Sequence, residues 1–183
     1  MATKTWQIDS AHTDAAFAVK HLMISTVRGH FGAVSGTVTV DEDDPKSAKV
    51  DVRIDTKSID TRQAQRDEHL RSADFFDVAN HPEIRFVSKR IDGDPRGEFK
   101  LTGDLTLRGT TREITLDVTN EGIGDDPWGN LRAGFSATGK ISRGNFGLTW
   151  NQALEAGGVV VGDEVKITID VEITRAKEVA KAA

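Results

Sequence analysis

Histidines are the residues that first suggest chemistry in this chain. There are five: His12, His21 and His30 stand nine residues apart, and His69 and His81 follow. Histidine is the commonest metal ligand and titrates near neutral pH. These five form neither an HExxH motif nor another close pair with ligand spacing. Because the chain also has no cysteine, we predict no metal site, no disulfide and no thiol catalysis.

Other catalytic patterns are missing as well. The strings GAVSG (32–36) and GFSAT (134–138) differ from the GxSxG turn of serine hydrolases and lie within strand patterns. Gly157 and Gly158 are not followed by the Gly-Lys-Ser/Thr of a phosphate-binding loop. The acidic run at 41–44 lacks the spacing and the glycine of a calcium loop. We therefore predict no catalytic residues and no cofactor.

Charge narrows the classes of partner. The formal net charge is −5, and we find no basic cluster in the sequence that would attract a nucleic acid. No apolar run approaches the roughly 20 residues that cross a bilayer, so we predict no transmembrane segment. The first residues, MATKTWQIDS, lack the apolar core of a signal peptide. The expected location is the cytoplasm.

Alternation of apolar and polar residues dominates the chain, which is typical of strands with one buried face. Short connections rich in Gly and Asp favour antiparallel pairing. The sequence predicts an all-β fold of about eight or nine strands, with a sheet curled around a core. The alternating series lie at residues 6–8, 17–21, 34–40, 50–54, 84–86, 99–107, 114–118, 131–137 and 165–173.

One segment, residues 60–72, breaks the alternation and predicts a short helix. Asp60 is the expected N-cap, with Gln63 reaching back as in a capping box. Asp67 and Arg71 stand four residues apart, in the order that favours an ion pair. A second irregular stretch spans residues 150–162. Without a linker or repeat, we expect one domain over 1–183, with a polar tail from about 176 to 183.

The aromatic residues are eight Phe, three Trp and no Tyr. Several of the Phe lie in alternating series and should face the interior. They could form an ordinary core, or they could line a cavity, because a barrel of about eight strands can hold a small ligand. His21 shares the expected inward face with Phe17 and Val19, where a histidine could orient the polar end of a ligand.

Five segments of the chain match a known family in the same order: residues 6–38, 58–88 (with HL, DFF and HPEIRF), 103–111, 143–147 (RGNFG) and 161–172. Through them the chain resembles the YceI-like family, also called the polyisoprenoid-binding, lipocalin-like family. The resemblance implies an extended antiparallel β-barrel of the lipocalin type with a helix near one end. It also implies a long apolar tunnel that binds, transports or stores an isoprenoid lipid, such as a prenyl quinone or a polyprenyl phosphate, without turnover, and a possible homodimer.

From the resemblance and the alternation we predict a ligand site inside the barrel. We expect His21 to meet a polar group of the ligand. Two alternatives remain open: an enzyme acting on a lipophilic substrate, and an interaction module whose barrel is filled by its own side chains. The predicted gate at one end consists of Phe31, Phe75, Phe76, Phe146 and Trp150. The predicted wall consists of Phe17, Val19, Val38, Val52, Ile54, Phe86, Leu101, Leu105, Leu116, Phe135, Ile167 and Ile169.

Overall fold

The computed structural model describes residues 3–152 and 159–176. Gly157, Gly158 and all of the expected tail except Ala176 lie outside the described residues. One antiparallel sheet contains every strand. The strands are β1 (Thr3–Ile8), β2 (Asp14–His21), β3 (Ser25–Phe31), β4 (Val34–Asp41), β5 (Asp44–Asp55), β6 (Ile59–Asp60), β7 (Glu83–Gly93), β8 (Glu98–Leu107), β9 (Thr110–Asp125), β10 (Asn130–Ser142) and β11 (Val161–Ala176). The helices are η1 (Ser10–His12), η2 (Thr56–Ser58), α1 (Ala64–Arg71) and η3 (Arg143–Phe146).

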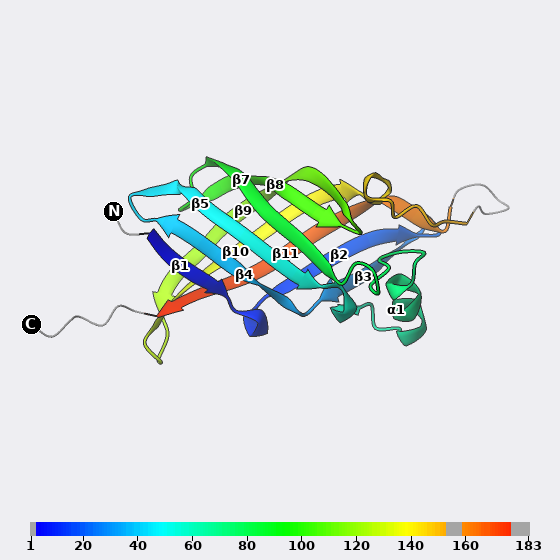
Figure 1. The fold of residues 1–183 in the computed structure, drawn as a ribbon, viewed down its shortest axis with the longest axis horizontal. Coiled ribbons are helices and arrows are strands. Elements are labelled where there is room, and N and C mark those ends of the chain that lie inside the picture. Colours follow the sequence, from blue (N-terminus) through cyan, green and yellow to red (C-terminus); the bar gives the residue numbers. More distant parts are fainter. Residues whose placement is uncertain (1–2, 153–158, 177–183) are drawn as a thin grey trace, which may run out of the picture.

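Eight of these strands close into a barrel in the order β1-β4-β5-β7-β8-β9-β10-β11, with β11 returning to β1. The closing contact, here called the seam, is short: its paired residues are Gln7 with Thr174 and Ile8 with Ile173. Figure 1 shows the strands running obliquely along an elongated barrel. The predicted all-β antiparallel barrel with a single short α-helix near one end is confirmed.

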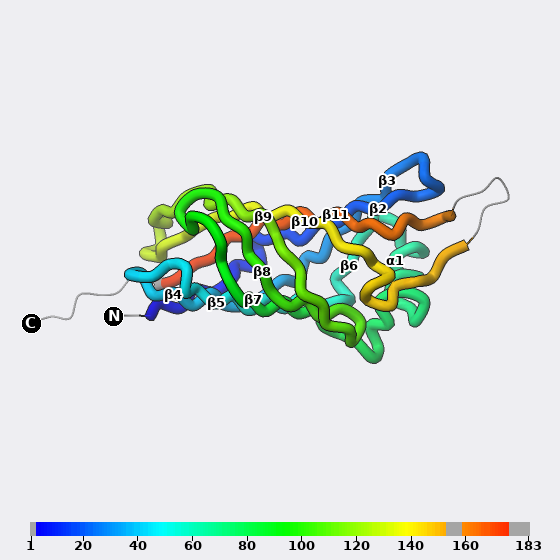
Figure 2. The backbone as a smooth tube through the Cα atoms, turned by 90° about the horizontal axis from the view of Figure 1, so that it is seen from above, coloured from blue at the N-terminus to red at the C-terminus, as the bar shows by residue number. Residues whose placement is uncertain are grey.

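Three further strands lengthen one side of the barrel. Beyond the seam, β11 pairs with β2 instead of β1, and the sheet continues through β3 to β6. This extension ends beside α1 (Figures 1 and 2). The sequence prediction omitted β3 and β6. In β3 the alternating series is interrupted by Gly29, where a Cβ would lie only 2.5 Å from Cζ of Phe17, and β6 has only two residues.

The helix begins later than predicted, and its cap is a different residue. Asp60 belongs to β6, and its carboxylate accepts a hydrogen bond from the N–H of Arg62 (2.8 Å). Arg62 has a φ of 66°, which interrupts any helix started at Asp60. The N-cap is therefore Gln63, whose side-chain oxygen accepts from the N–H of Arg66.

The expected Asp67–Arg71 ion pair is wrong, because both side chains have other partners. Asp67 is buried, and its carboxylate accepts from the N–H (2.9 Å) and the hydroxyl of Thr61. Arg71 donates to the carbonyls of Lys57 (3.2 Å) and Ile59 (3.0 Å). Both residues thus tie α1 to the segment that precedes it rather than to each other.

Apolar side chains in the barrel form two clusters. The larger contains Phe31, Phe86 and Leu101 among its buried members and extends through most of the interior. The smaller gathers around Trp6 at the seam, with Ala133 of β10 and Ile173 of β11. Among the described residues, no helix is both long and apolar enough to cross a membrane.

Candidate functional site

The structure brings most of the predicted wall and gate residues together in the apolar interior. Val38 packs against the smaller cluster, and the others contribute to the larger one. Those that are buried are Phe31, Phe75, Phe86, Leu101, Leu105, Leu116 and Phe146. Those that are partly buried and pack against the buried set are Phe17, Val38, Val52, Ile54, Phe76, Phe135, Trp150 and Ile169.

Three predicted site residues lie outside both clusters. Val19, His21 and Ile167 are half-buried and sit towards the α1 end of β2 and β11. His21 ends β2 and pairs with Ser25 across the hairpin. Its proposed role at the polar end of a ligand stays a prediction.

Phe135 lies at the boundary between the two clusters and packs against both. Its ring meets Phe99 edge to face, with centroids 6.4 Å apart. β10, which carries Phe135, is paired on both sides, with β9 and β11. Because neighbouring strands flank it, the partial exposure of an inward side chain favours space along the barrel interior. A chain lying along both clusters would have to pass this ring.

Aromatic side chains close the interior at the α1 end. Phe31 contacts Phe76 edge to face at 5.6 Å between ring centroids. The ring centroid of Trp150 lies 5.3 Å from that of Phe75 and 4.8 Å from that of His69. We call Phe31, Phe75, Phe76, Trp150 and His69 the aromatic cluster. The sequence prediction missed His69, although its HL dipeptide lies in one of the matching segments.

Two hollows lie elsewhere in the structure. One, of about 490 Å³, is bounded by Ser10, Val34, Arg53 and Glu83 among other residues. A second, also about 490 Å³, lies over the seam and includes Arg132. Neither is lined by any residue of the predicted wall.

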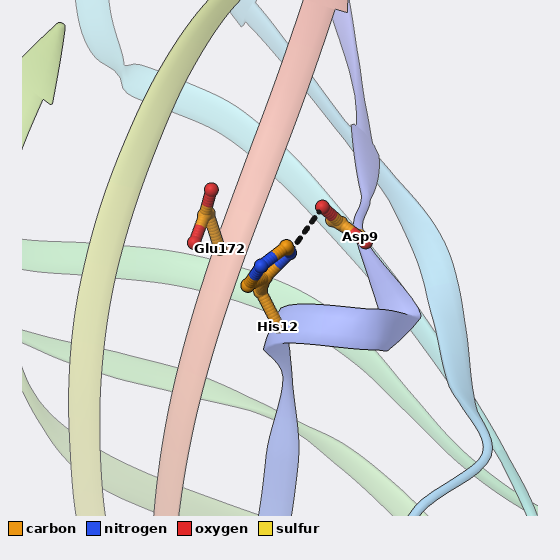
Figure 3. Close-up of side chains that lie close together, drawn as sticks. All are labelled: Asp9, His12 and Glu172. Carbon is orange, nitrogen blue, oxygen red and sulfur yellow. Dashed lines mark hydrogen bonds and ion pairs between the residues drawn. The ribbon is translucent and has the colours of Figure 1, made fainter. Parts of the chain in front are cut away.

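A polar group lies at the seam, where the sequence analysis predicted no metal site. Figure 3 shows Asp9, His12 and Glu172 converging, and their potential ligand atoms all lie within 4.8 Å of one another. The guanidinium of Arg132 already binds both carboxylates of this group. Its Nη1 donates to Asp9 at 2.7 Å and to Glu172 at 2.8 Å. Its Nε donates to Asp126 at 2.8 Å. A cation here would have to compete with a guanidinium, so we interpret the group as an ionic clasp on the seam.

A comparison with protein families decides where this barrel belongs. The model of the YceI-like domain matches residues 6–173. The chain belongs to the YceI-like family. The resemblance seen in the sequence is thereby confirmed.

Relatives of this YceI-like protein support the assignment. The YceI protein of Escherichia coli O157:H7 is 46% identical over 142 residues, covering 76% of this chain and 73% of that protein. The crystal structure of the Campylobacter jejuni YceI protein is 32% identical, with a TM-score of 0.71, covering 86% of this chain and 90% of that one. A polyisoprenoid-binding domain from Saccharophagus degradans shares the fold at 14% identity and a TM-score of 0.65, covering 92% and 97%.

Arg143, the first residue of the RGNFG segment, is a buried cation in this YceI-like barrel. Its guanidinium donates to four backbone carbonyls, and burial lowers its pKa. It thereby holds η3 and the chain up to Trp150 against the start of β11. The partners are Leu148 (2.6 Å), Gly162 (2.8 Å), Trp150 (3.0 Å) and Val161 (3.2 Å).

Two carboxylates of the ionic clasp have lowered pKa values. Burial alone would raise the pKa of Asp126, but hydrogen bonds from Asn130, Arg132 and the Trp128 N–H outweigh it and bring this pKa to about 2. The pKa of Asp9 is lowered chiefly by its hydrogen bond from Arg132. Both groups thus favour the folded state when ionised, above the ordinary value of 3.8. Their contribution is lost as pH falls through the folded pKa.

We expect Asp126→Asn to weaken the pH dependence of stability. Asparagine keeps an acceptor oxygen for the loop N–H groups but cannot ionise. Urea unfolding at about pH 6 should show the variant less stable than the wild type, and the difference should shrink towards about pH 2. Stability curves that stay parallel over this range would contradict the assignment to Asp126.

Proposed function

We propose that this protein binds the long apolar chain of an isoprenoid-type lipid inside the barrel and carries or stores it without chemical change. The observation that carries the proposal is the continuous apolar lining formed by the two clusters, which meet at Phe135. Burial stabilises by roughly 25 cal/mol per Å² of apolar surface. A long polyprenyl chain could therefore bind tightly with no hydrogen bond along its length.

Membership of the YceI-like family supports this proposal. The S. degradans domain of the same fold is described as polyisoprenoid-binding. A prenyl quinone and a polyprenyl phosphate share the apolar chain and differ in the head group. In our proposal the chain is held by the apolar wall, while the head group meets polar residues at one end of the barrel.

The proposal is tested by native mass spectrometry of the purified protein, followed by organic extraction and identification of the bound molecules. We expect a co-purifying mass that matches a prenyl lipid, lost on extraction and regained when prenyl lipid is added back. The same spectrum counts the subunits and so tests the homodimer suggested by the relatives. A protein that is empty and takes up no added prenyl lipid would contradict the proposal.

The second candidate is an interaction module with a filled barrel. It is favoured by the two hollows of about 490 Å³, whose linings contain no residue of the predicted wall. The two candidates differ in what happens when the interior is made more crowded, which the Phe135 variant below measures.

A further inference from the structure

The hairpin that joins β2 to β3 exposes an apolar tip. Met23 is 55% exposed and Ile24 is 83% exposed, both among the large exposed hydrophobic residues of the described chain. The hairpin projects from the α1 end of the barrel, as Figures 1 and 2 show. Large apolar side chains at a protruding tip are costly in water and mark a surface that meets a partner.

The backbone of this tip is also strained. Leu22 and Met23 have φ values of 52° and 61°, and Ile24 N–H donates back to the His21 carbonyl at 3.2 Å. Positive φ at both central residues is the geometry of a type I′ turn, which favours Asn-Gly. The turn between β8 and β9 meets the same demand with Arg108 and Gly109. Leu22 and Met23 at the β2–β3 tip therefore adopt a backbone conformation that bulky residues disfavour.

Charge on the hairpin itself is positive in an otherwise acidic protein, and the acidic residues of β11 beside it, Asp163 and Glu164, are bound to Ser142 and Lys140. Lys20 and Arg28 flank it and are exposed. Residues 15–40 contain no Asp or Glu, although the chain has 29 of them. An anionic bilayer has hydrocarbon chains beneath a layer of negatively charged groups. An apolar tip flanked by cations is complementary to such a surface.

A second exposed tip lies at the opposite end of the barrel and provides the contrast. The β9–β10 hairpin exposes Ile123 (67%) and Trp128 (78%). Its neighbours Asp125 and Asp126 are acidic, and residues 121–131 contain no lysine or arginine. The two hairpins lie at opposite ends of the barrel (Figure 1), and of these two tips only the β2–β3 tip combines exposed apolar side chains with flanking positive charge.

We propose that the β2–β3 hairpin docks the protein onto an anionic lipid bilayer. Met23 and Ile24 enter the boundary of the acyl chains, while Lys20 and Arg28 lie against the phosphate groups. Docking in this way brings the α1 end of the barrel, with its aromatic cluster, towards the membrane. Docking can be tested separately from the proposed cargo, because vesicle binding is measured with protein from which bound lipid has been extracted.

The test is flotation of the full chain with vesicles of phosphatidylcholine alone or with added phosphatidylglycerol. We expect binding to the anionic vesicles that weakens with salt. Ile24→Ser should lower the affinity about ten-fold, since a large apolar side chain is lost from the contact. Lys20→Gln combined with Arg28→Gln should remove the preference for anionic vesicles. The matched control, Trp128→Ser at the opposite end, should bind like the wild type.

The double variant Leu22→Asn, Met23→Gly serves as the control for loss of binding caused by misfolding. These residues suit the type I′ turn, so thermal unfolding should occur no lower than in the wild type while vesicle binding is lost. Absence of wild-type binding to anionic vesicles, or an equal loss in Trp128→Ser and Ile24→Ser, would overturn the proposal. So would a dimer in solution that Ile24→Ser dissociates, because a second copy would then cover the tip.

Discussion

Phe135→Trp should abolish uptake of prenyl lipid while leaving the barrel as stable as the wild type. Phe135 lies where the two apolar clusters meet, and its partly buried ring faces Phe99. A guest that lies along both clusters must pass this point. The larger indole would occupy the path, and space around the partly exposed Phe135 ring would accommodate it without strain.

The measurement is binding of a fluorescent prenyl lipid, together with urea unfolding of the same preparations. Thr138→Trp places the same indole on the exposed face of the same strand and should leave both quantities unchanged. Leu105→Trp, on β8, should repeat the loss of binding. If Phe135→Trp instead lowers the free energy of unfolding by about 1–3 kcal/mol, as overpacking does, the barrel is filled by its own side chains.

Much of the barrel could be predicted from the sequence because its strands each have one buried face. In β8, for example, the alternation of Leu101, Leu105 and Leu107 with polar residues follows directly from the period of a strand. The sequence did not predict β3, because Gly29 replaces the apolar residue that would complete its alternating pattern. The helix start was misplaced because a capping box also fits Asp60, and only the positive φ of Arg62 rules it out.

The apolar lining of the site was predictable because its residues alternate along the strands. The polar contacts that stabilise the barrel around it were not. Alternation assigns Phe86 or Leu116 to an inward face without knowledge of its neighbours. The clasp joins Arg132 to Asp9 across 123 positions of the chain, and no local pattern indicates that contact. The sequence could not indicate the role of Arg143, because its partners are backbone carbonyls, which any sequence could provide.

Arg143→Met should destabilise the fold strongly. The apolar side chain fills a similar volume but leaves the carbonyls of Leu148 and Gly162 without the guanidinium that donates to them, whereas the Val161 carbonyl keeps its hydrogen bond from Asn151. Hydrogen bonds to a charged group contribute about 1.5–3 kcal/mol each, so we expect a loss of at least about 3 kcal/mol in the free energy of unfolding. Urea unfolding measures this loss.

Two further variants separate the hydrogen bonds of Arg143 from its charge. Arg143→Lys keeps the cation but cannot span four carbonyls, so its stability should fall between those of Arg143→Met and the wild type. Arg112→Met removes an exposed arginine whose Nε donates to the Asn145 carbonyl at 3.3 Å, and it should change stability by no more than about 0.5 kcal/mol. Because Arg143 also holds the Trp150 carbonyl, its loss should loosen the contacts of Trp150 with His69 and Phe75. An Arg143→Met protein that unfolds like the wild type would show that the η3 segment is held by its apolar contacts, with Phe146 as the principal anchor.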